Sequence, residues 1–513
     1  MFLSLPGRKD EMVFSSLPFL FIFLPVCLIL YNVVPGWVRE KGAALGKGGD
    51  LKEKGGDGAG SCVRLKKKDM RYKNAVLLLM SLVFYTAGEP VYVVLLVLCA
   101  LAGWLSGFFI DKYRDSSPKK AKAAAVICVA ICLSMLFVFK YLGFFIDTLR
   151  LLPFIHLPAV KLTLPIGISF YTFQTISYDI DLLRGRAGLQ RNFGRFLLFV
   201  ALFPQLIAGP ILRYKDIEAQ LTDRTATREK FCEGIVRFLC GCGKKVLIAN
   251  TLGELVSFTF SAGAEGVAKA NVWLGVLAFS LQIYYDFSGY SDMAIGLGKM
   301  FGFDYGENFN YPYVSRSVTE FWRRWHISLG SFFRDYVYIP LGGNRRHQVL
   351  NLLAVWLLTG LWHGAGWNFV LWGLYFFVLL VIEKFLLKGR LEKIPVLSNV
   401  VTLPLLAVGW AVFYFEDTRQ CLTALGSMFG IGGAPTWDNV GANMFLAKLP
   451  VILTALAGCL PIGAFVGKKV ASLRTKRPVL WFTLVFLYTS AMLFLCVCAL
   501  VSSTYNPFLY FRF

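Results

Sequence analysis

Apolar runs long enough to cross a lipid bilayer recur along the whole chain, separated by polar segments. About 20 apolar residues in a helix span the ~30 Å hydrocarbon core of a membrane. This pattern predicts an all-α polytopic integral membrane protein, and residues 213–230 are predicted to be a charged loop. The runs that predict membrane helices are residues 12–34, 74–88, 90–110, 121–146, 164–185, 193–212 (broken by its prolines), 231–260, 271–302, 397–415, 446–466 and 479–504, with a hairpin at 351–384.

Residues 317–346 depart from this pattern, because five arginines, two acidic residues and a histidine are interspersed with aromatic residues. Ser317 and Glu320 form an S-x-x-E capping box, which predicts a helix start. Glu320 lies four residues before Arg324 and can pair with it. A helix of this composition is too polar to span a bilayer and too apolar to leave it. We therefore expect an amphipathic interfacial or re-entrant helix that keeps His326 solvated.

Charge sets the expected orientation. Residues 36–73 are rich in glycine and carry eleven lysines and arginines, so they are predicted to form a flexible cytoplasmic linker. The N-terminus, ahead of the first span at 12–34, is then outside, and Met12 is a candidate start of translation. The basic turn at 468–477 and the last span place the C-terminal tail, residues 505–513, outside as well.

Composition supports a membrane body. Hydrophobic residues make up 56% of the chain and charged residues 16%, against roughly 25% charged in soluble proteins. Basic cytoplasmic loops explain the formal net charge of +22, so we expect membrane lipids and no nucleic acid as partners. The cysteines and histidines show no metal-ligand spacing, and no metal site is predicted.

Two of the four histidines lie in the most distinctive segments. His363 is an ionisable residue deep in an apolar hairpin, and Gly360, Gly364 and Gly366 beside it predict a helix break. Such a histidine is either a core residue hydrogen-bonded to a backbone carbonyl or a functional group. A histidine that titrates near pH 7 is the usual base for activating a hydroxyl. His326 has the same two interpretations.

Further polar residues stand in apolar surroundings. Buried carboxylates are costly and are expected to face the protein interior or water. The candidates for binding or orienting a substrate are Asp286, Asp292, Arg323, Arg324, Trp362 and Asn368. The run at 271–302 also has glycines that allow close helix approach, at positions 289, 296, 298 and 302. The chain has no G-x-S-x-G elbow and no phosphate-binding glycine loop, which argues against an acyl-serine intermediate and nucleotide chemistry.

Long motifs give the chain a family resemblance. They extend from MVFSSLPFLFIFLPV (12–26) through LPIGISFYTFQTISYDID, LFPQLIAGPI, YYDFSGYSDMAIGLGKMFGF, NFNYPY, FWRRWHISLGSFFRDYVYIPLGGNR and LWHGAGWNFVLWGLY to the terminal FLYFRF. In these motifs the chain resembles the membrane-bound O-acyltransferase (MBOAT) family, specifically its bacterial alginate O-acetyltransferase and teichoic-acid D-alanyl-transfer branch. The resemblance covers nearly the whole chain, and the linker 36–73 departs from it.

The resemblance implies a fold and a site. It implies a single MBOAT membrane domain over residues 1–513, with about 11 transmembrane helices plus re-entrant or interfacial helices around a central funnel or tunnel. The family's two signature histidines fall on His326 and His363, and the second is regarded as the catalytic one. No cofactor is expected to be tightly bound. The implied acyl donor is cytoplasmic acetyl-CoA or an acyl carrier protein thioester, with His363 removing a proton from the attacking hydroxyl.

The length of 513 residues and the terminal FLYFRF favour the O-acetyltransferase branch. We then expect acetyl groups to cross the bacterial inner membrane and reach an extracytoplasmic polysaccharide through a separate SGNH-type transferase. Terminal aromatic–tyrosine motifs in the family resemble acyl relays, so Tyr510 is a third catalytic candidate, against the alternative of an interfacial anchor. Two other functions stay open: D-alanyl transfer to teichoic acid from a carrier protein, and a transporter or channel without chemistry whose intramembrane histidine relays protons.

Overall fold

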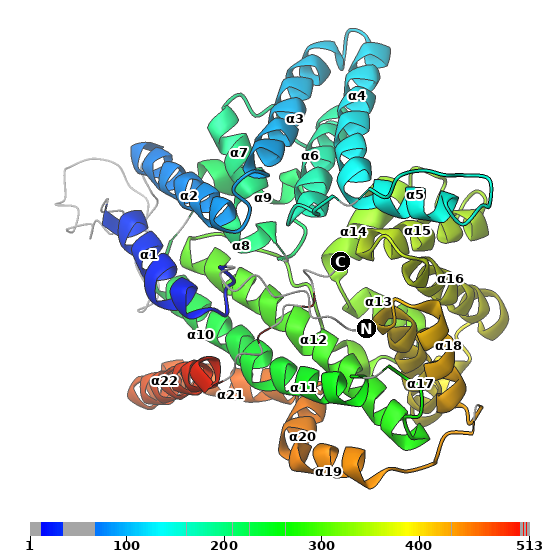
Figure 1. Ribbon diagram of the computed structural model, residues 1–513. Coiled ribbons are helices and arrows are strands. Elements are labelled where there is room, and N and C mark those ends of the chain that lie inside the picture. Colours follow the sequence, from blue (N-terminus) through cyan, green and yellow to red (C-terminus); the bar gives the residue numbers. More distant parts are fainter. Residues whose placement is uncertain are drawn as a thin grey trace.

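The computed structural model describes residues 12–33, 67–160, 162–207, 209–224, 226–261, 263–431, 433–502, 506 and 509. These residues contain helices and no strand (Figure 1). Within them, five helical segments are long and apolar enough to cross a membrane, or six if one bent pair counts as a single span. The prediction of an all-helical, multi-pass membrane protein is therefore confirmed, whereas the count of about 11 spans stays a prediction.

The first half of the chain alternates membrane-length helices with shorter ones. In order they are η1 (Phe19–Phe23), α1 (Leu24–Val33), α2 (Lys67–Gly88), α3 (Val93–Tyr113), α4 (Pro118–Leu136), η2 (Phe137–Tyr141), α5 (Leu142–Leu149), α6 (Ile168–Leu183), α7 (Phe193–Ala201), α8 (Phe203–Leu206), α9 (Tyr214–Thr222), α10 (Arg228–Gly243), η3 (Lys244–Ala249) and α11 (Asn250–Thr259). Helix α2 begins inside the predicted linker 36–73, so that linker ends earlier than predicted; its residues 36–66 lie outside the described part.

The second half begins with the longest helix. In order its helices are α12 (Lys269–Met300), η4 (Pro312–Val314), α13 (Val318–Arg324), α14 (Ile327–Phe333), η5 (Arg334–Tyr338), α15 (Gln348–His363), α16 (Trp367–Val381), η6 (Ile382–Leu387), η7 (Leu391–Lys393), α17 (Pro395–Tyr414), α18 (Thr418–Met428), α19 (Asn439–Ala447), α20 (Leu449–Gly458), α21 (Ile462–Lys476) and α22 (Pro478–Ser502).

Helix α12 runs through the middle of the molecule and is buried along most of its 32 residues (Figure 1). Its glycines bring it against α10. A Cβ at Gly289 would lie 2.8 Å from the carbonyl oxygen of Gly241, and one at Gly296 would lie 2.6 Å from that of Gly234. Any larger residue would push the two backbones apart, which is why small residues mark close helix contacts in membranes. The predicted close approach at these two positions is confirmed.

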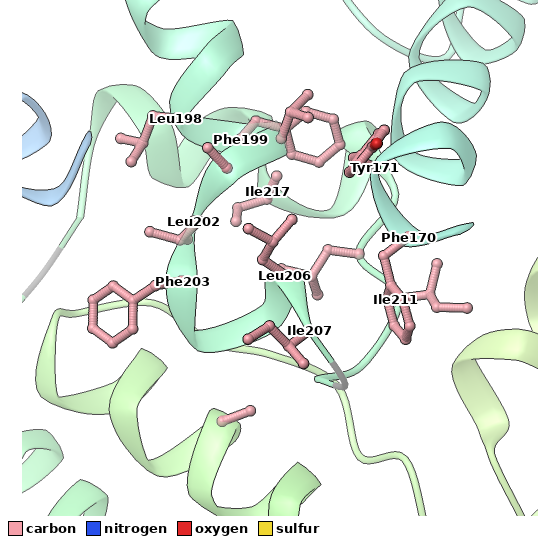
Figure 2. Close-up of a cluster of buried hydrophobic side chains, with 14 of the residues drawn as sticks. Phe170, Tyr171, Leu198, Phe199, Leu202, Phe203, Leu206, Ile207, Ile211 and Ile217 are labelled. Atoms are coloured by element: carbon pink, nitrogen blue, oxygen red, sulfur yellow. The ribbon is translucent and has the colours of Figure 1, made fainter. Parts of the chain in front are cut away.

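The predicted break in residues 193–212 is also confirmed. Helix α7 ends at Ala201 and α8 begins at Phe203, with a proline in its first turn. Figure 2 shows the apolar cluster that fixes this turn, in which Phe199, Leu202 and Leu206 are fully buried. This packing places the chain after α8 beside the first turn of α6.

The prediction of a charged loop at 213–230 is wrong in part, because residues Tyr214–Thr222 form the helix α9. Tyr214, Ile217 and Leu221 recur at helical spacing and are buried, while the charged residues between them face outward. The apolar stripe outweighs the charges that suggested a loop.

The predicted span at 446–466 is not one straight helix, and it stays a prediction as a span broken by prolines. That range covers the end of α19, all of α20 and the start of α21, and α19 meets α20 at an angle of 62°. Proline has no backbone N–H and its ring clashes with the preceding turn. Pro450 therefore prevents α19 from continuing, and Pro461 stands at the break between α20 and α21.

Candidate active site

The segment around His326 begins with the predicted capping box. The side chain of Ser317 accepts a hydrogen bond from the backbone N–H of Glu320 at 3.1 Å, and Glu320 pairs with Arg324 at 2.8 Å. Glu383 of η6 adds a second anchor that the sequence did not reveal. Its carboxylate accepts hydrogen bonds from the backbone N–H groups of Val318 at 2.6 Å and of its neighbour at 2.8 Å. A carboxylate at a helix N-terminus accepts hydrogen bonds from N–H groups that have no partner within the helix, and it interacts favourably with the helix dipole. Glu383 therefore attaches the start of α13 to η6, which follows α16.

The prediction of one continuous, solvated helix is wrong at His326. Helix α13 ends at Arg324, α14 begins at Ile327, and His326 between them has a left-handed backbone with φ +44°. Its side chain is only 2% exposed. The ring lies 4.7 Å from that of Phe287 and 5.4 Å from that of Trp362, measured between centroids. Long-range packing by these rings buries a residue that its local sequence would place at a polar surface.

Hydrogen bonds define which nitrogen of His326 is basic. The Oδ1 atom of Asn308 lies 3.1 Å from Nδ1 of His326, and the backbone N–H and hydroxyl of Ser328 donate to the same oxygen at 3.2 and 2.9 Å. A backbone N–H can only donate, so this Asn308 atom is the acceptor and Nδ1 carries the proton. The lone pair then resides on Nε2, which is buried and has no hydrogen-bond partner within the described part of the chain.

His363 lies at the predicted helix break, which is confirmed. It is the last residue of α15, and α16 begins four residues later. Its ring centroid lies 4.9 Å from that of Trp362, 5.1 Å from that of Trp372 and 5.2 Å from that of Phe413. Asn368 donates to the backbone carbonyl of Phe413 at 3.4 Å, so it ties α16 to α17 beside this aromatic enclosure.

Helices α15 and α16 form a hairpin in backbone contact. A Cβ added to Gly360 would collide with the carbonyl oxygen of Phe369, and one added to Gly373 would collide with that of Trp356. Gly360, three residues before His363, is therefore required by the packing between the two helices. The hairpin presents His363 at its turn.

Trp362 brings the two signature positions together. Its ring contacts those of both His326 and His363, at 5.4 and 4.9 Å between centroids. The structure thus unites three of the predicted site residues, which come from two separate segments of the chain. This cluster is the strongest candidate for a chemical centre.

One residue of this centre was missed by the sequence analysis. Lys140 of η2 is buried, and its Nζ donates to the backbone carbonyl of Trp362. Lys140 and His363 line one cavity with a volume of about 40 Å³, whose other walls include Phe170 and Ile207; Figure 2 shows these last two side chains. The available signal was the position of Lys140 deep within the apolar run 121–146, since ionisable residues inside a membrane are usually functional.

The remaining candidates lie elsewhere. Asp292 pairs with Arg237 at 2.6 Å and with Lys244 at 2.7 Å, joining α12 to α10 and η3. Arg324 is occupied by Glu320, and Arg323 is exposed. Their predicted roles in substrate binding stay predictions, and the geometry gives Asp292 and Arg324 structural partners.

Asp286 of α12 is a point of contact between the helices and the C-terminal segment. Its carboxylate lies 2.6 Å from Nζ of Lys245, with both side chains almost fully buried, and accepts the backbone N–H of Leu509 at 3.0 Å. Asn506 donates to the carbonyl of Ser15 at 3.0 Å. Tyr510 itself lies outside the described residues, and of the tail 505–513 the structure describes Asn506 and Leu509.

Comparison with known proteins identifies the family. The family model described as "MBOAT, membrane-bound O-acyltransferase family" matches residues 190–415, which include both histidines. The probable alginate O-acetylase AlgI of Pseudomonas aeruginosa is 40% identical over 438 residues, covering 83% of this chain and 76% of that protein. The chain belongs to the membrane-bound O-acyltransferase family.

Other MBOAT relatives define the neighbouring branches. The peptidoglycan O-acetyltransferase of Helicobacter pylori is 30% identical over 461 residues, covering 83% of this chain and 81% of that protein. The teichoic acid D-alanyltransferase of Bacillus subtilis is 27% identical over 349 residues, covering 62% and 84%. As an MBOAT member the chain is a membrane acyltransferase, so the alternative of a transporter without chemistry is set aside.

Proposed function

We propose that this MBOAT protein takes acetyl groups from a cytoplasmic thioester and delivers them across the bacterial inner membrane for O-acetylation of an extracytoplasmic polysaccharide. The O-acetylase relatives support transfer of an acetyl group rather than a D-alanyl group. The O-acetylase from Pseudomonas aeruginosa is 40% identical over 83% of this chain, whereas the D-alanyltransferase from Bacillus subtilis is 27% identical over 62% of it. The observation that carries the chemistry is the buried pair of histidines on the ring of Trp362.

The proposed reaction is acyl transfer from a thioester, with acetyl-CoA or an acyl carrier protein thioester as donor. His363 removes the proton of the attacking hydroxyl while its oxygen bonds to the acyl carbon. The carbon–sulfur bond then breaks, and the proton passes to the departing thiolate. General-base catalysis of this kind contributes about 10²–10⁴-fold. The unprotonated Nε2 of His326, whose ring also contacts Trp362, accepts a hydrogen bond from a reacting group.

The proposed first acceptor is the hydroxyl of Tyr510, which passes the acetyl group to a separate SGNH-type transferase outside the membrane. This requires the C-terminus to be extracytoplasmic, as the basic turn at 468–477 predicts, with the N-terminus on the same side. Support comes from Leu509, the residue before Tyr510, which is buried and bonded to Asp286. A tail that served only as an interfacial anchor would not need this internal attachment.

The test uses purified protein in lipid nanodiscs with acetyl-CoA, acetyl carrier protein and D-alanyl carrier protein. Release of free thiol from an acetyl donor, with loss in His363→Ala, is the expected result. Turnover of the D-alanyl donor alone would move the chain to the D-alanyl branch, and no turnover of any thioester would refute the proposal. Tyr510→Phe keeps the ring and removes the hydroxyl, so polymer acetylation in cells should fall to background, and unchanged acetylation would exclude the relay.

A further inference from the structure

Lys140 is a buried lysine inside an apolar segment. It lies within Pro118–Leu149, one of the membrane-length apolar segments, and is 9% exposed. Among the described residues, no carboxylate forms an ion pair with it. Taking an ammonium out of water costs several kcal/mol, and a bilayer interior makes such a residue rare unless it has a function.

The C-terminal end of α15 compensates this charge only in part. The last carbonyls of a helix have no partner within the helix and carry about half a negative charge. Two neighbouring residues of η2 satisfy them, since Lys140 donates to the carbonyl of Trp362 and the hydroxyl of Tyr141 donates to that of Leu361 at 2.8 Å. The described surroundings of Lys140 thus supply only the partial negative charge of a helix end as a counter-charge.

The uncompensated charge faces the candidate centre. Lys140 and His363 line the same cavity, and the carbonyl that Lys140 binds belongs to Trp362, whose ring contacts both histidines. The cavity volume of about 40 Å³ holds a few groups of the size of water. An acyl carbonyl fits this space, whereas a bulky donor head group does not.

We propose that Lys140 is a catalytic residue whose ammonium stabilises the oxyanion formed on the acyl carbonyl during transfer. This inference rests on the proposed acyl transfer at His363. When the acceptor hydroxyl oxygen bonds to the carbonyl carbon, its proton goes to His363 and the carbonyl electron pair moves to the carbonyl oxygen. That oxygen becomes negative beside Nζ of Lys140. Collapse of the intermediate restores the carbonyl, breaks the carbon–sulfur bond and sends the proton to the thiolate.

A cation without a carboxylate partner suits this task. The substrate thioester is neutral at its carbonyl, so Lys140 gains its full counter-charge only as the oxyanion forms. Interactions that strengthen in the transition state raise kcat and leave substrate binding nearly unchanged. A carboxylate beside Lys140 would have cancelled this difference. Removal of one preorganised oxyanion donor typically costs about 10²–10³ in kcat.

The test compares Lys140→Met with Tyr141→Phe in the nanodisc thiol-release assay. Lys140→Met keeps the length of the side chain and removes the charge, and it should lower kcat by about 10²–10³ with KM within a few-fold of the unchanged protein. Tyr141→Phe removes the hydrogen bond to the adjacent carbonyl of the same helix end and should lower kcat by less than about tenfold. An equal loss in both variants would show that Lys140 only fixes the end of α15.

A second variant covers the case in which Lys140→Met does not purify. Lys140→Gln keeps a donor toward the carbonyl of Trp362 without the charge, and the same loss of kcat is expected. Wild-type kcat in either uncharged variant would overturn the role of Lys140 while leaving the proposed function intact. Absence of thiol release from the unchanged protein would overturn both.

Discussion

The two turns that carry histidine differ in how they hold the ring. Both histidines follow a tryptophan in the sequence and both contact Trp362. His326 occupies a left-handed turn and is fixed by a hydrogen bond from Nδ1 to Asn308, whereas His363 ends a helix inside a set of aromatic rings with Lys140 at the same cavity. One turn selects a tautomer by polar contacts, and the other creates a low-dielectric enclosure beside a charge. Similar dipeptides thus give two different chemical environments.

The largest effect is expected when each histidine is removed in turn. His363→Ala should lower acyl transfer by about 10²–10⁴, because it removes the general base, while His326→Ala should lower it less. The measurement is thiol release by purified protein together with polymer acetylation in cells. Near wild-type transfer in His363→Ala would contradict its role, and equal losses would mean that both histidines share the proton transfer.

The tautomer of His326 can be tested at Asn308. Asn308→Ala removes the acceptor that holds the proton on Nδ1, and loss of a buried hydrogen-bond partner costs about 1–3 kcal/mol, or roughly 5- to 160-fold if the whole cost appears in the rate. Asn308→Asp retains an acceptor at this position and is the matched control, with a smaller loss expected. If Asn308→Ala turns over like the unchanged protein, the polar contacts of His326 have no part in catalysis.

The third prediction separates the histidine centre from the C-terminal tail. Asp286→Leu should destabilise the protein by about 3–5 kcal/mol, because it leaves Lys245 buried without its partner. The double variant Asp286→Leu, Lys245→Met should regain most of that stability, yet it still lacks the acceptor for the N–H of Leu509. Thermal unfolding in detergent checks the stability of both variants.

Activity of this double variant decides the role of the tail. We expect thiol release from the thioester to persist, since the histidines are untouched, and polymer acetylation to fall by tenfold or more, because about 1.4 kcal/mol of lost attachment already gives that factor. Full polymer acetylation would show that the attachment at Asp286 is dispensable for delivery.

The smallest expected effect is a pH dependence of local stability at Asp335 in η5, the helix that follows α14. Burial would raise the pKa of Asp335, but the hydrogen bond and charge of Arg334 and the charge of Arg213 outweigh it and lower that pKa below its ordinary value. A depressed carboxyl pKa stabilises the folded state above the unfolded pKa of about 3.9. This stability is lost as the pH falls from there through the lower folded pKa.

Hydrogen exchange can follow this change. At pH 3 to 4 the amides of η5 should exchange faster than at pH 5, relative to those of the α15–α16 turn, by a modest factor because the pair is near the surface. Asp335→Asn should abolish the difference between the two pH values. Equal acceleration in both regions would mean that acid loosens the whole protein instead.

The sequence predicted correctly those features that depend on residues close together in the chain. The capping box at Ser317, the helix break at His363 and the glycines at 289 and 296 depend on spacing of a few residues, and the structure confirms them. The sequence did not predict those features that depend on residues far apart in the chain. Glu383 reaches Val318 across 65 positions and Lys140 reaches Trp362 across 222, and the ring of Phe287 that buries His326 comes from α12. No local pattern contains such pairings.

The backbone contact between α15 and α16 has a consequence for motion. Because Gly360 and Gly373 leave no room for a side chain between the two helices, we expect the hairpin to move as one rigid body that carries His363 at its turn. Two residues with left-handed backbones flank the hairpin, namely His347 before α15 and Lys388 after η6. Hinges are commonly found at such ends of helices. In the proposed transfer, we expect adjustment to acyl groups of different length to fall to the cavity residues of η2 and of the start of α6.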